Sequence, residues 1–216
     1  MKYDLVIFDL DGTSLETIGD LAAAINGALE KEGLPTRSLD QVRKGIGGGV
    51  GNLVRVSVPE GTDEATIQRI IPDFKVRYSK DVNVLTHPFD GIRELFEKIR
   101  AAGIRLAVNS NKVDDAVCTL CESHFPGLIE CIVGERPEFP KKPAPDGAKH
   151  ILKLMNVAPE RTLYVGDGDS DVMTARNAGV DCAWVSWGYR TREELGDLVP
   201  ANAFDTVEEL EKFILG

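Results

Sequence analysis

The chain has little of several features that would point to particular classes of protein. Its 216 residues include only four cysteines and three histidines, and 25 Lys and Arg face 35 Asp and Glu, giving a net charge of -10. Four cysteines are few for a disulfide scaffold. Without an excess of Lys and Arg, non-specific binding to nucleic acid or to a membrane surface is not expected. A small anionic substrate is not excluded, because a local pocket can be positive in an acidic protein.

Long apolar runs are also missing. No stretch of the sequence approaches the ~20 apolar residues needed to cross a bilayer. Asp4 and Asp9 interrupt the N-terminal segment where a secretory signal requires a continuous apolar core. We therefore expect a cytoplasmic protein with no membrane partner. Its length and 43% apolar content suit one full core and a small additional domain.

The cysteines and histidines do not form a convincing metal pattern. Cys118 and Cys121 make a CxxC, but no second CxxC or HxxxH accompanies it, and the pair lies in a helical pattern. This favours buried packing thiols over a redox or zinc role. His87, His124 and His150 share no metal-like spacing, and we interpret them as structural.

The most informative stretch is residues 7–13, which read IFDLDGT. The apolar run at residues 5–8 is typical of a strand buried on both faces, and Asp9 and Asp11 follow it just before Gly12. Strand alternation places both carboxylates on the same side of the backbone, which is unfavourable unless a cation or a shared proton offsets it. A divalent metal is the simplest explanation.

Apolar, strand-like runs alternate with helical periodicity along the chain, which indicates an α/β protein with a parallel sheet. The expected strands are residues 4–8, 105–109, 129–133, 162–165 and 181–186. Gly103 and Gly179 provide helix stops before two of them. Thr191 and Thr206, each followed three residues later by Glu, predict capping boxes that open two later helices.

One long interval breaks the alternation, and it looks helical. A stripe of apolar residues starts at Ile18, Ser38 caps a second helix, and Thr62 starts a third that Pro72 should kink or divide. A simple insertion on the sheet edge is one interpretation. We favour a helical cap at residues 15–84 over a core formed by residues 1–14 and 85–216, because α/β sheets bind ligands at the carboxyl ends of their strands.

Four separated motifs then occur in order after the expected strands. They are DLDGT at residues 9–13, NSNK at 109–112, KKPAPD at 141–146 and VGDGDSD at 165–171. On these motifs the chain resembles the haloacid dehalogenase superfamily, in its phosphatase branch with a helical cap, and is similar to the phosphoglycolate phosphatase group. The resemblance implies a Rossmann-like core with strand order 3-2-1-4-5, helices on both faces and an inserted cap.

The resemblance also implies the catalytic roles. Asp9 attacks phosphorus and becomes an aspartyl phosphate, which splits one difficult displacement into two easier ones. Asp11 protonates the leaving oxygen and then activates water. Ser110 and Asn111, at the end of the second strand, would hold phosphoryl oxygens, and Lys142 would neutralise the nucleophile and the phosphoryl group.

Two further lysines lie beside these residues in the motifs. We interpret Lys141 as a solvated neighbour of Lys142. Lys112 follows Asn111, and a solvated position at the start of a helix is an equal alternative to a role in the site.

The acids of the last motif, Asp167, Asp169 and Asp171, predict a magnesium site, since Mg²⁺ prefers oxygen ligands and takes few carboxylates. By the resemblance, Asp167 is a direct ligand together with Asp9 and the backbone carbonyl of Asp11. Asp171 would not bind the metal directly but would hold a metal-bound water or Lys142. Asp169 has no role in the family and is expected in a loop or a helix cap.

The chain departs from its relatives directly after the first motif. It has SLET at residues 14–17 where the group commonly continues with Leu, Asp and Ser, which puts the substrate assignment in doubt. Arg43 precedes a glycine-rich stretch at residues 45–51 and could bind a second carboxylate or phosphate of the substrate. A flexible turn beside a solvated Arg is an equal alternative.

These observations predict a magnesium-dependent phosphatase that acts on a small-molecule phosphate ester, with phosphoglycolate the leading candidate. The alternatives are a sugar-phosphate mutase or a pyrophosphatase of the same superfamily. A receiver-like signalling domain is more remote, because receivers are shorter, have no cap and do not use the DxD pair. A dehalogenase is not expected either, because that reaction needs neither an acid-base carboxylate at Asp11 nor an acidic metal site. No motif indicates the natural substrate or the oligomeric state.

Overall fold

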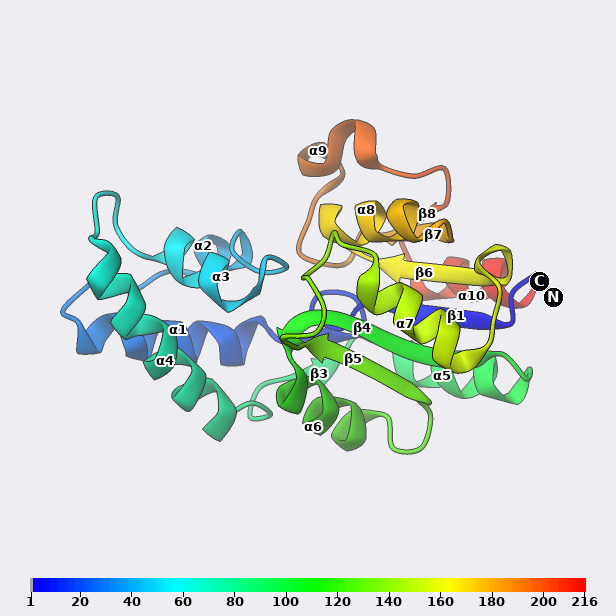
Figure 1. Cartoon of the computed structure of the whole chain (residues 1–216), viewed down its shortest axis with the longest axis horizontal. Helices are drawn as coiled ribbons and strands as arrows, with labels where there is room; N and C mark the ends of the chain where they lie inside the picture. Colours follow the sequence, from blue (N-terminus) through cyan, green and yellow to red (C-terminus); the bar gives the residue numbers. More distant parts are fainter. Residues whose placement is uncertain (1) are drawn as a thin grey trace.

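The structure is a computed structural model that describes residues 2–216. Its centre is a six-stranded parallel sheet in the order β5-β4-β1-β6-β7-β8 (Figure 1). The strands are β1 (Leu5–Phe8), β4 (Arg105–Val113), β5 (Cys131–Glu135), β6 (Thr162–Gly166), β7 (Asp181–Val185) and β8 (Ala203–Phe204). The expected order of five strands is confirmed, and β8 extends the sheet beyond β7.

Helices cover both faces of this sheet, as expected. They are α5 (Ile92–Ala101), α6 (Asp114–His124), α7 (Asp146–Met155), α8 (Asp169–Ala178), α9 (Arg192–Leu195) and α10 (Val207–Leu215). The alternation of β1 separates two cores: Val6 and Phe8 pack with α5, α6 and α10, whereas Leu5 and Ile7 pack with α7 and α8. The predicted capping boxes at Thr191 and Thr206 are present.

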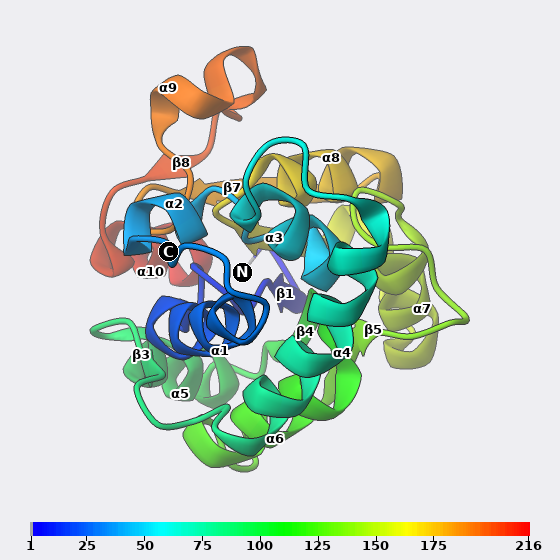
Figure 2. The ribbon, with the colours of Figure 1, turned by 90° about the vertical axis from the view of Figure 1, so that its left-hand side faces the viewer.

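The long interval after β1 forms a group of four helices, which we call the helical segment (residues 18–80). Its members are α1 (Ile18–Lys31), α2 (Leu39–Arg43), α3 (Gly49–Ser57) and α4 (Glu64–Lys80). A two-stranded antiparallel pair, β2 (Leu15–Glu16) with β3 (His87–Pro88), joins it to the rest of the chain. The carboxyl ends of β4, β5 and β6 point toward these helices in Figure 1, and Figure 2 shows the helices lying in front of the sheet.

Three details of the helical segment differ from the prediction. The third expected helix begins after Asp63, not at Thr62, because the Asp63 carboxylate accepts the N–H of Thr66 at 2.9 Å. Pro72 lies inside α4 without dividing it. Helix α3 was not predicted at all, since it starts within the glycine-rich stretch.

The strand β4 also continues four residues past its predicted end and includes residues 110–112. Its register with β5 shifts between Asn109 and Val113. These polar residues are buried rather than in an open loop, because the helical segment covers this end of the sheet.

The cysteines behave as packing residues. All four are free thiols, and burial raises the pKa of Cys121 to about 12, which keeps it protonated. His87 lies beside Glu16, His124 contacts Asn83, and His150 packs on Phe139, so they share no site. Among residues 2–216, no helix has the length and apolar character needed to traverse a bilayer.

Candidate active site

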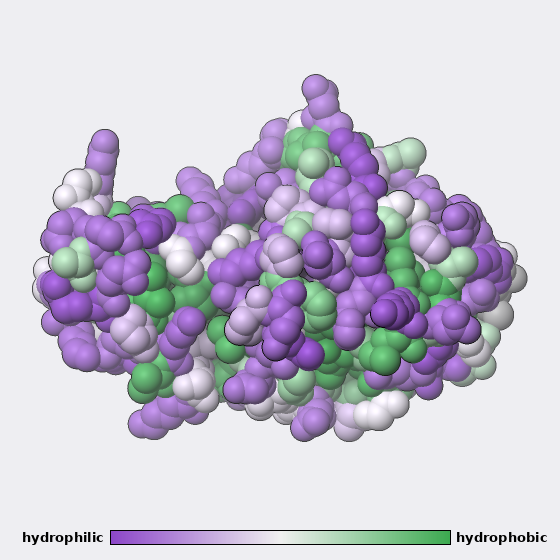
Figure 3. Space-filling model, viewed as in Figure 1, coloured by the Kyte–Doolittle hydropathy of each residue, from purple (hydrophilic) through white to green (hydrophobic). Residues whose placement is uncertain are grey.

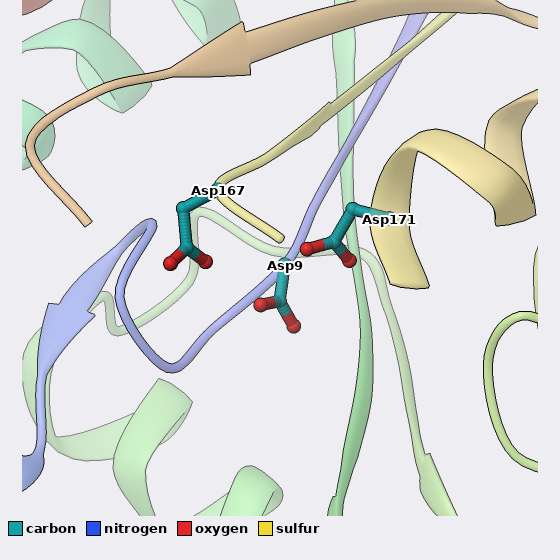
Figure 4. A group of neighbouring side chains, drawn as sticks. All are labelled: Asp9, Asp167 and Asp171. Carbon is teal, nitrogen blue, oxygen red and sulfur yellow. The ribbon is translucent and has the colours of Figure 1, made fainter. Parts of the chain in front are cut away.

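Three carboxylates and one ammonium group meet at the carboxyl end of the sheet. Asp9 follows β1, Asp167 follows β6 and Asp171 lies in the first turn of α8, so their side chains converge from neighbouring elements (Figure 4). One oxygen from each lies within 4.8 Å of the others. Lys142, from the loop before α7, places its Nζ atom 2.6 Å from both Asp9 and Asp171. All four side chains are buried.

The charges in this cluster do not balance. Burial, followed by the negative charge of Asp171, raises the pKa of Asp9 well above its usual range despite Lys142. The same two causes, in the same order, raise the pKa of Asp167 to about 7. Three carboxylates beside one ammonium group leave excess negative charge that a divalent cation would offset. Because all three side chains offer oxygen atoms, the residues fit a hard metal ion.

Asp167 is held in place by two donors. The Thr13 hydroxyl donates to one carboxylate oxygen at 3.1 Å, and the Tyr189 N–H donates to the other at 2.6 Å. Gly12 passes directly against this carboxylate: its φ is +87°, and a Cβ there would lie 2.7 Å from Asp167 Oδ2. The first motif therefore needs its glycine both for a left-handed backbone and for close approach to the acid.

The side chain of Asp11 has its own partners, away from the three-carboxylate cluster. Lys112 Nζ lies 2.8 and 3.0 Å from its two oxygens, and the Thr17 hydroxyl donates to it at 2.6 Å. Lys112 is buried and also lies over the ring of Tyr78, 4.6 Å from the ring centroid. The interpretation of Lys112 as a solvated helix-start residue is therefore wrong.

Ser110 and Asn111 lie beside Lys142 at the end of β4. The Asn111 side chain accepts the N–H of Lys142 at 2.8 Å and donates to the carbonyls of Lys142 and Gly47 at 3.1 and 2.8 Å. The Ser110 Oγ atom accepts the N–H of Lys112 at 3.2 Å. Asn111 thus fixes the loop that carries Lys142 and contacts the helical segment. Phosphoryl binding by Ser110 and Asn111 stays a prediction.

Arg43 does not join these residues. Its guanidinium binds Glu194 at 2.9 and 3.0 Å, contacts Asp40 at 3.3 Å and donates to the carbonyl of Tyr189. Arg190 adds a second link between the same two regions, because it donates to three carbonyls in and just after α2, those of residues 43, 44 and 46. Arg43 therefore connects the helical segment to the α9 region, and this position gives no support to a contact with substrate.

A cavity of about 370 Å³ lies between the helical segment and the sheet. Asp9, Asp11, Ser110, Asn111 and Lys142 all line it. Both aspartates of the first motif therefore face one cavity, although β1 ends at Phe8 and the Asp11 side chain pairs with Lys112 instead of joining the carboxylate cluster. The space-filling view shows apolar surface where the helical segment, on the left, meets the rest of the molecule (Figure 3).

Comparison with known proteins agrees with this geometry. The family of haloacid dehalogenase-like hydrolases matches residues 6–185. The chain belongs to this family. Phosphoglycolate phosphatase of Pseudomonas syringae pv. tomato is 32% identical over 212 residues, which cover 95% of this chain and 78% of the relative. Phosphoglycolate phosphatase of Aquifex aeolicus is 30% identical over 98% of both chains.

One solved structure superposes on this protein along the whole chain. The crystal structure of a protein from Lactobacillus delbrueckii subsp. bulgaricus, proposed to be a phosphoglycolate phosphatase, has a TM-score of 0.94 and 34% identity and covers all of both chains. The α/β fold predicted from the alternation of strands and helices is therefore confirmed for this family member.

Sequence reasoning missed one residue that this hydrolase places near the site, Tyr189, and left the role of a second, Lys112, open. The Tyr189 hydroxyl accepts the N–H groups of Thr17 and Ile18 at 2.7 and 3.0 Å, at the entry to α1. Nothing in the sequence marks Tyr189, because it lies in a loop far from the first motif. Lys112 was within the NSNK motif, but only the fold shows that its ammonium reaches Asp11.

Proposed function

We propose that this protein hydrolyses phosphate monoesters through an aspartyl phosphate formed on Asp9. The observation that carries the proposal is the position of Lys142, with Nζ 2.6 Å from Asp9 and from Asp171 at the floor of the cavity. A buried ammonium beside a buried carboxylate allows an anionic phosphoryl group to approach, and charge neutralisation with in-line positioning is most of what phosphoryl transfer requires.

In the first half-reaction, an Asp9 carboxylate oxygen attacks phosphorus and the bond from phosphorus to the leaving oxygen breaks. Asp11 gives its proton to that oxygen, so the product leaves as a neutral alcohol. The Thr17 hydroxyl and Lys112 fix the direction of the Asp11 carboxyl. Proton transfer by a positioned acid contributes about 10² to 10⁴-fold.

In the second half-reaction, water attacks the phosphorus of the acyl phosphate. Asp11, now a carboxylate, takes a proton from this water, and the bond from phosphorus to Asp9 breaks to release inorganic phosphate. The Ser110 hydroxyl and the backbone N–H of Asn111 hold phosphoryl oxygens in both steps, because the side-chain amide of Asn111 is already bonded to Lys142 and Gly47. Lys142 offsets the charge of the phosphoryl group.

A metal ion completes this arrangement, and the fit of the buried acids supports one. Asp9, Asp167 and the backbone carbonyl of Asp11 would hold it, and when bound it supplies positive charge against the phosphoryl oxygens. Asp171 keeps Lys142 in place, as its 2.6 Å contact indicates. We propose Mg²⁺ because the donors are all oxygen and few in number.

We also propose that residues 15–84 act as a cap on a core formed by residues 1–14 and 85–216, with the β2–β3 pair as the connection. Phosphoglycolate is the first substrate to test, because two curated relatives carry that activity in their names. A cytoplasmic location is consistent with four free thiols.

The test is release of inorganic phosphate from p-nitrophenyl phosphate and phosphoglycolate by the purified protein, with Mg²⁺ and with EDTA. We expect turnover only with the metal, and none in Asp9→Asn. Asp169→Asn is the matched control, since this acid of the same motif has a side chain that is 63% exposed, and it should retain activity. Turnover of halogenated acids without metal, or full activity of Asp9→Asn, would contradict the proposal.

A further inference from the structure

The cavity above Asp9 is larger than a phosphoryl group requires. Its volume of about 370 Å³ falls within the roughly 300–1,000 Å³ typical of sites for drug-sized organic ligands. Asp9, Asp11, Ser110 and Lys142 form its polar floor, and Lys75, Ser79, Asp115 and Thr119 also line it. The remaining space extends between α3 and α4 and must receive the organic part of the substrate.

Apolar side chains form much of the walls of that remaining space, and they come from several elements. Ile46 precedes α3, Leu53 lies in α3, Phe74 and Tyr78 lie in α4, and Leu21 lies in α1. All five are buried. The rings of Phe74 and Tyr78 are stacked, with centroids 5.7 Å apart and planes 4° apart. Binding is therefore more favourable for a substrate whose apolar part is buried against these walls.

The same walls offer little to a second anionic group. Three lysines line the cavity, but Lys112 is paired with Asp11, Lys142 is paired with Asp9, and Lys75 is exposed. A carboxylate carried into the apolar part would therefore lose its hydration without meeting a free buried cation among the described residues.

Two other sources of positive potential lie along the described cavity wall, the exposed side chain of Lys75 and the N-terminus of α3. Gly49 and Val50 line the cavity there. A helix N-terminus carries about half an elementary charge, less than the full cation that a lysine or arginine would supply. A second anion would bind at this N-terminus or at Lys75, and this alternative is one outcome of the test below.

On the basis of the proposed phosphatase activity, we propose that the preferred substrate is a monophosphate of an apolar alcohol, with a ring or a chain of several carbons and no second charge. The phosphoryl group binds at Asp9 and Lys142, and the hydrocarbon part lies against Leu53 and Phe74.

The experiment compares n-alkyl phosphates from ethyl to hexyl, together with esters of the same lengths that end in a carboxylate. These alcohols are leaving groups of closely similar acidity, so differences in kcat/KM report binding of the hydrocarbon and not the ease of bond breaking. We expect kcat/KM to rise about fourfold for each methylene that is buried. The kcat/KM of each carboxylate-ended ester should be at least about tenfold lower than that of the alkyl ester of the same length, since burying an unpaired charge is unfavourable.

Either of two results overturns this proposal: no dependence on chain length, or a preference for carboxylate-ended esters and phosphoglycolate. The second result would place the further anion at Lys75 or at the N-terminus of α3. Failure of the phosphatase activity itself is distinguishable, because p-nitrophenyl phosphate would then also remain uncleaved in the presence of Mg²⁺, and this proposal would fail with it.

A variant pair locates the hydrocarbon part. Leu53 and Val56 both lie in α3, but Leu53 is 4% exposed and lines the cavity, whereas Val56 is 46% exposed. Leu53→Ala should lower the ratio of kcat/KM for hexyl to that for ethyl phosphate by about fivefold or more, while Val56→Ala leaves it unchanged. Leu53→Met, which retains volume, should restore most of the ratio. The ratio is internal to each protein, so partial unfolding does not obscure it. An unchanged ratio in Leu53→Ala contradicts the proposal.

Discussion

Replacing the proposed nucleophile should make the metal-free protein more stable while it abolishes turnover. In Asp9→Asn the side chain keeps its shape, and its remaining oxygen still accepts from Lys142, whose Nζ lies 2.6 Å from Asp9 Oδ1. What disappears is one of three negative charges in a buried cluster. Lys142 keeps its second partner, Asp171, so the substitution leaves no unpaired ammonium.

The size of the effect follows from the geometry. Two like charges 4.8 Å apart, the limit within which the three carboxylates lie, repel by about 3.5 kcal/mol at an effective dielectric constant near 20. Asp9 has two such neighbours, which gives about 7 kcal/mol, against about 6 kcal/mol of attraction to Lys142 at 2.6 Å. These nearly cancel, so the desolvation of a buried carboxylate is left uncompensated. We expect Asp9→Asn to gain about 1 to 3 kcal/mol of unfolding free energy, or roughly 2 to 10 °C in Tm.

The pH dependence has a definite sign. Because the pKa of Asp9 is raised in the folded protein above its ordinary value of 3.8, the folded state retains a proton that the unfolded chain releases. The stability of the wild type therefore falls as the pH rises from about 4 through the raised pKa, and the variant lacks this loss. The difference between the two proteins should be large near pH 8 and small near pH 4.

The assay is thermal and urea unfolding in EDTA at these two pH values, repeated with Mg²⁺, beside phosphatase activity. Millimolar Mg²⁺ should stabilise the wild type more than the variant, since only the wild type retains both charged ligands. Circular dichroism controls for the fold. If Asp9→Asn is less stable than the wild type in EDTA near pH 8, the charge of Asp9 is already compensated, and the argument for a metal at this cluster fails.

Three further substitutions test the neighbours of the site. Asp11→Asn should lose about 10² to 10⁴-fold in kcat/KM on alkyl phosphates and far less on p-nitrophenyl phosphate, whose leaving group needs little protonation; equal losses would count against an acid role. Arg43→Ala should raise KM for charged and uncharged substrates alike, because Arg43 binds Glu194 and not the cavity; an effect confined to a doubly anionic substrate would restore the recognition role. Lys112→Met should lower the unfolding free energy by about 3 kcal/mol by leaving Asp11 without its buried cation, whereas Lys75→Met, on an exposed lysine at the same cavity, should change it by less than about 0.5 kcal/mol.

The fold was largely predictable from local patterns. Apolar runs of strand length such as residues 5–8, helix stops such as Gly179 and capping boxes such as Thr206 with Glu209 act over a few residues, so the sequence displays them directly. The strand order came from the resemblance. The two-residue strand β8 is too short for a periodic signal. Helix α3 was missed because Gly49 and Gly51 obscure a helix that packing on α4 stabilises.

The site, too, was only partly predictable from the sequence. Residues within the four motifs could be named from the sequence, and the structure brings Asp9, Lys142, Asp167 and Asp171 together. The resemblance gave the partners of Lys142, but the sequence did not give the partners of Lys112 and Arg43. Arg43 beside a glycine-rich stretch is equally compatible with an anion site and with an ion pair, and the choice depends on Glu194, 151 residues away.

The contacts between the helical segment and the rest of the chain connect substrate selection to catalysis. Asn111 donates at 2.8 Å to the carbonyl of Gly47 while it holds the backbone of Lys142, and the ring of Tyr78 packs on the ammonium that binds Asp11. A movement of the helical segment would therefore disturb both the cation beside the nucleophile and the cation beside the acid. It follows that an organic group filling the apolar part of the cavity would act on kcat as well as KM, because the walls that bind it also keep the catalytic charges in position.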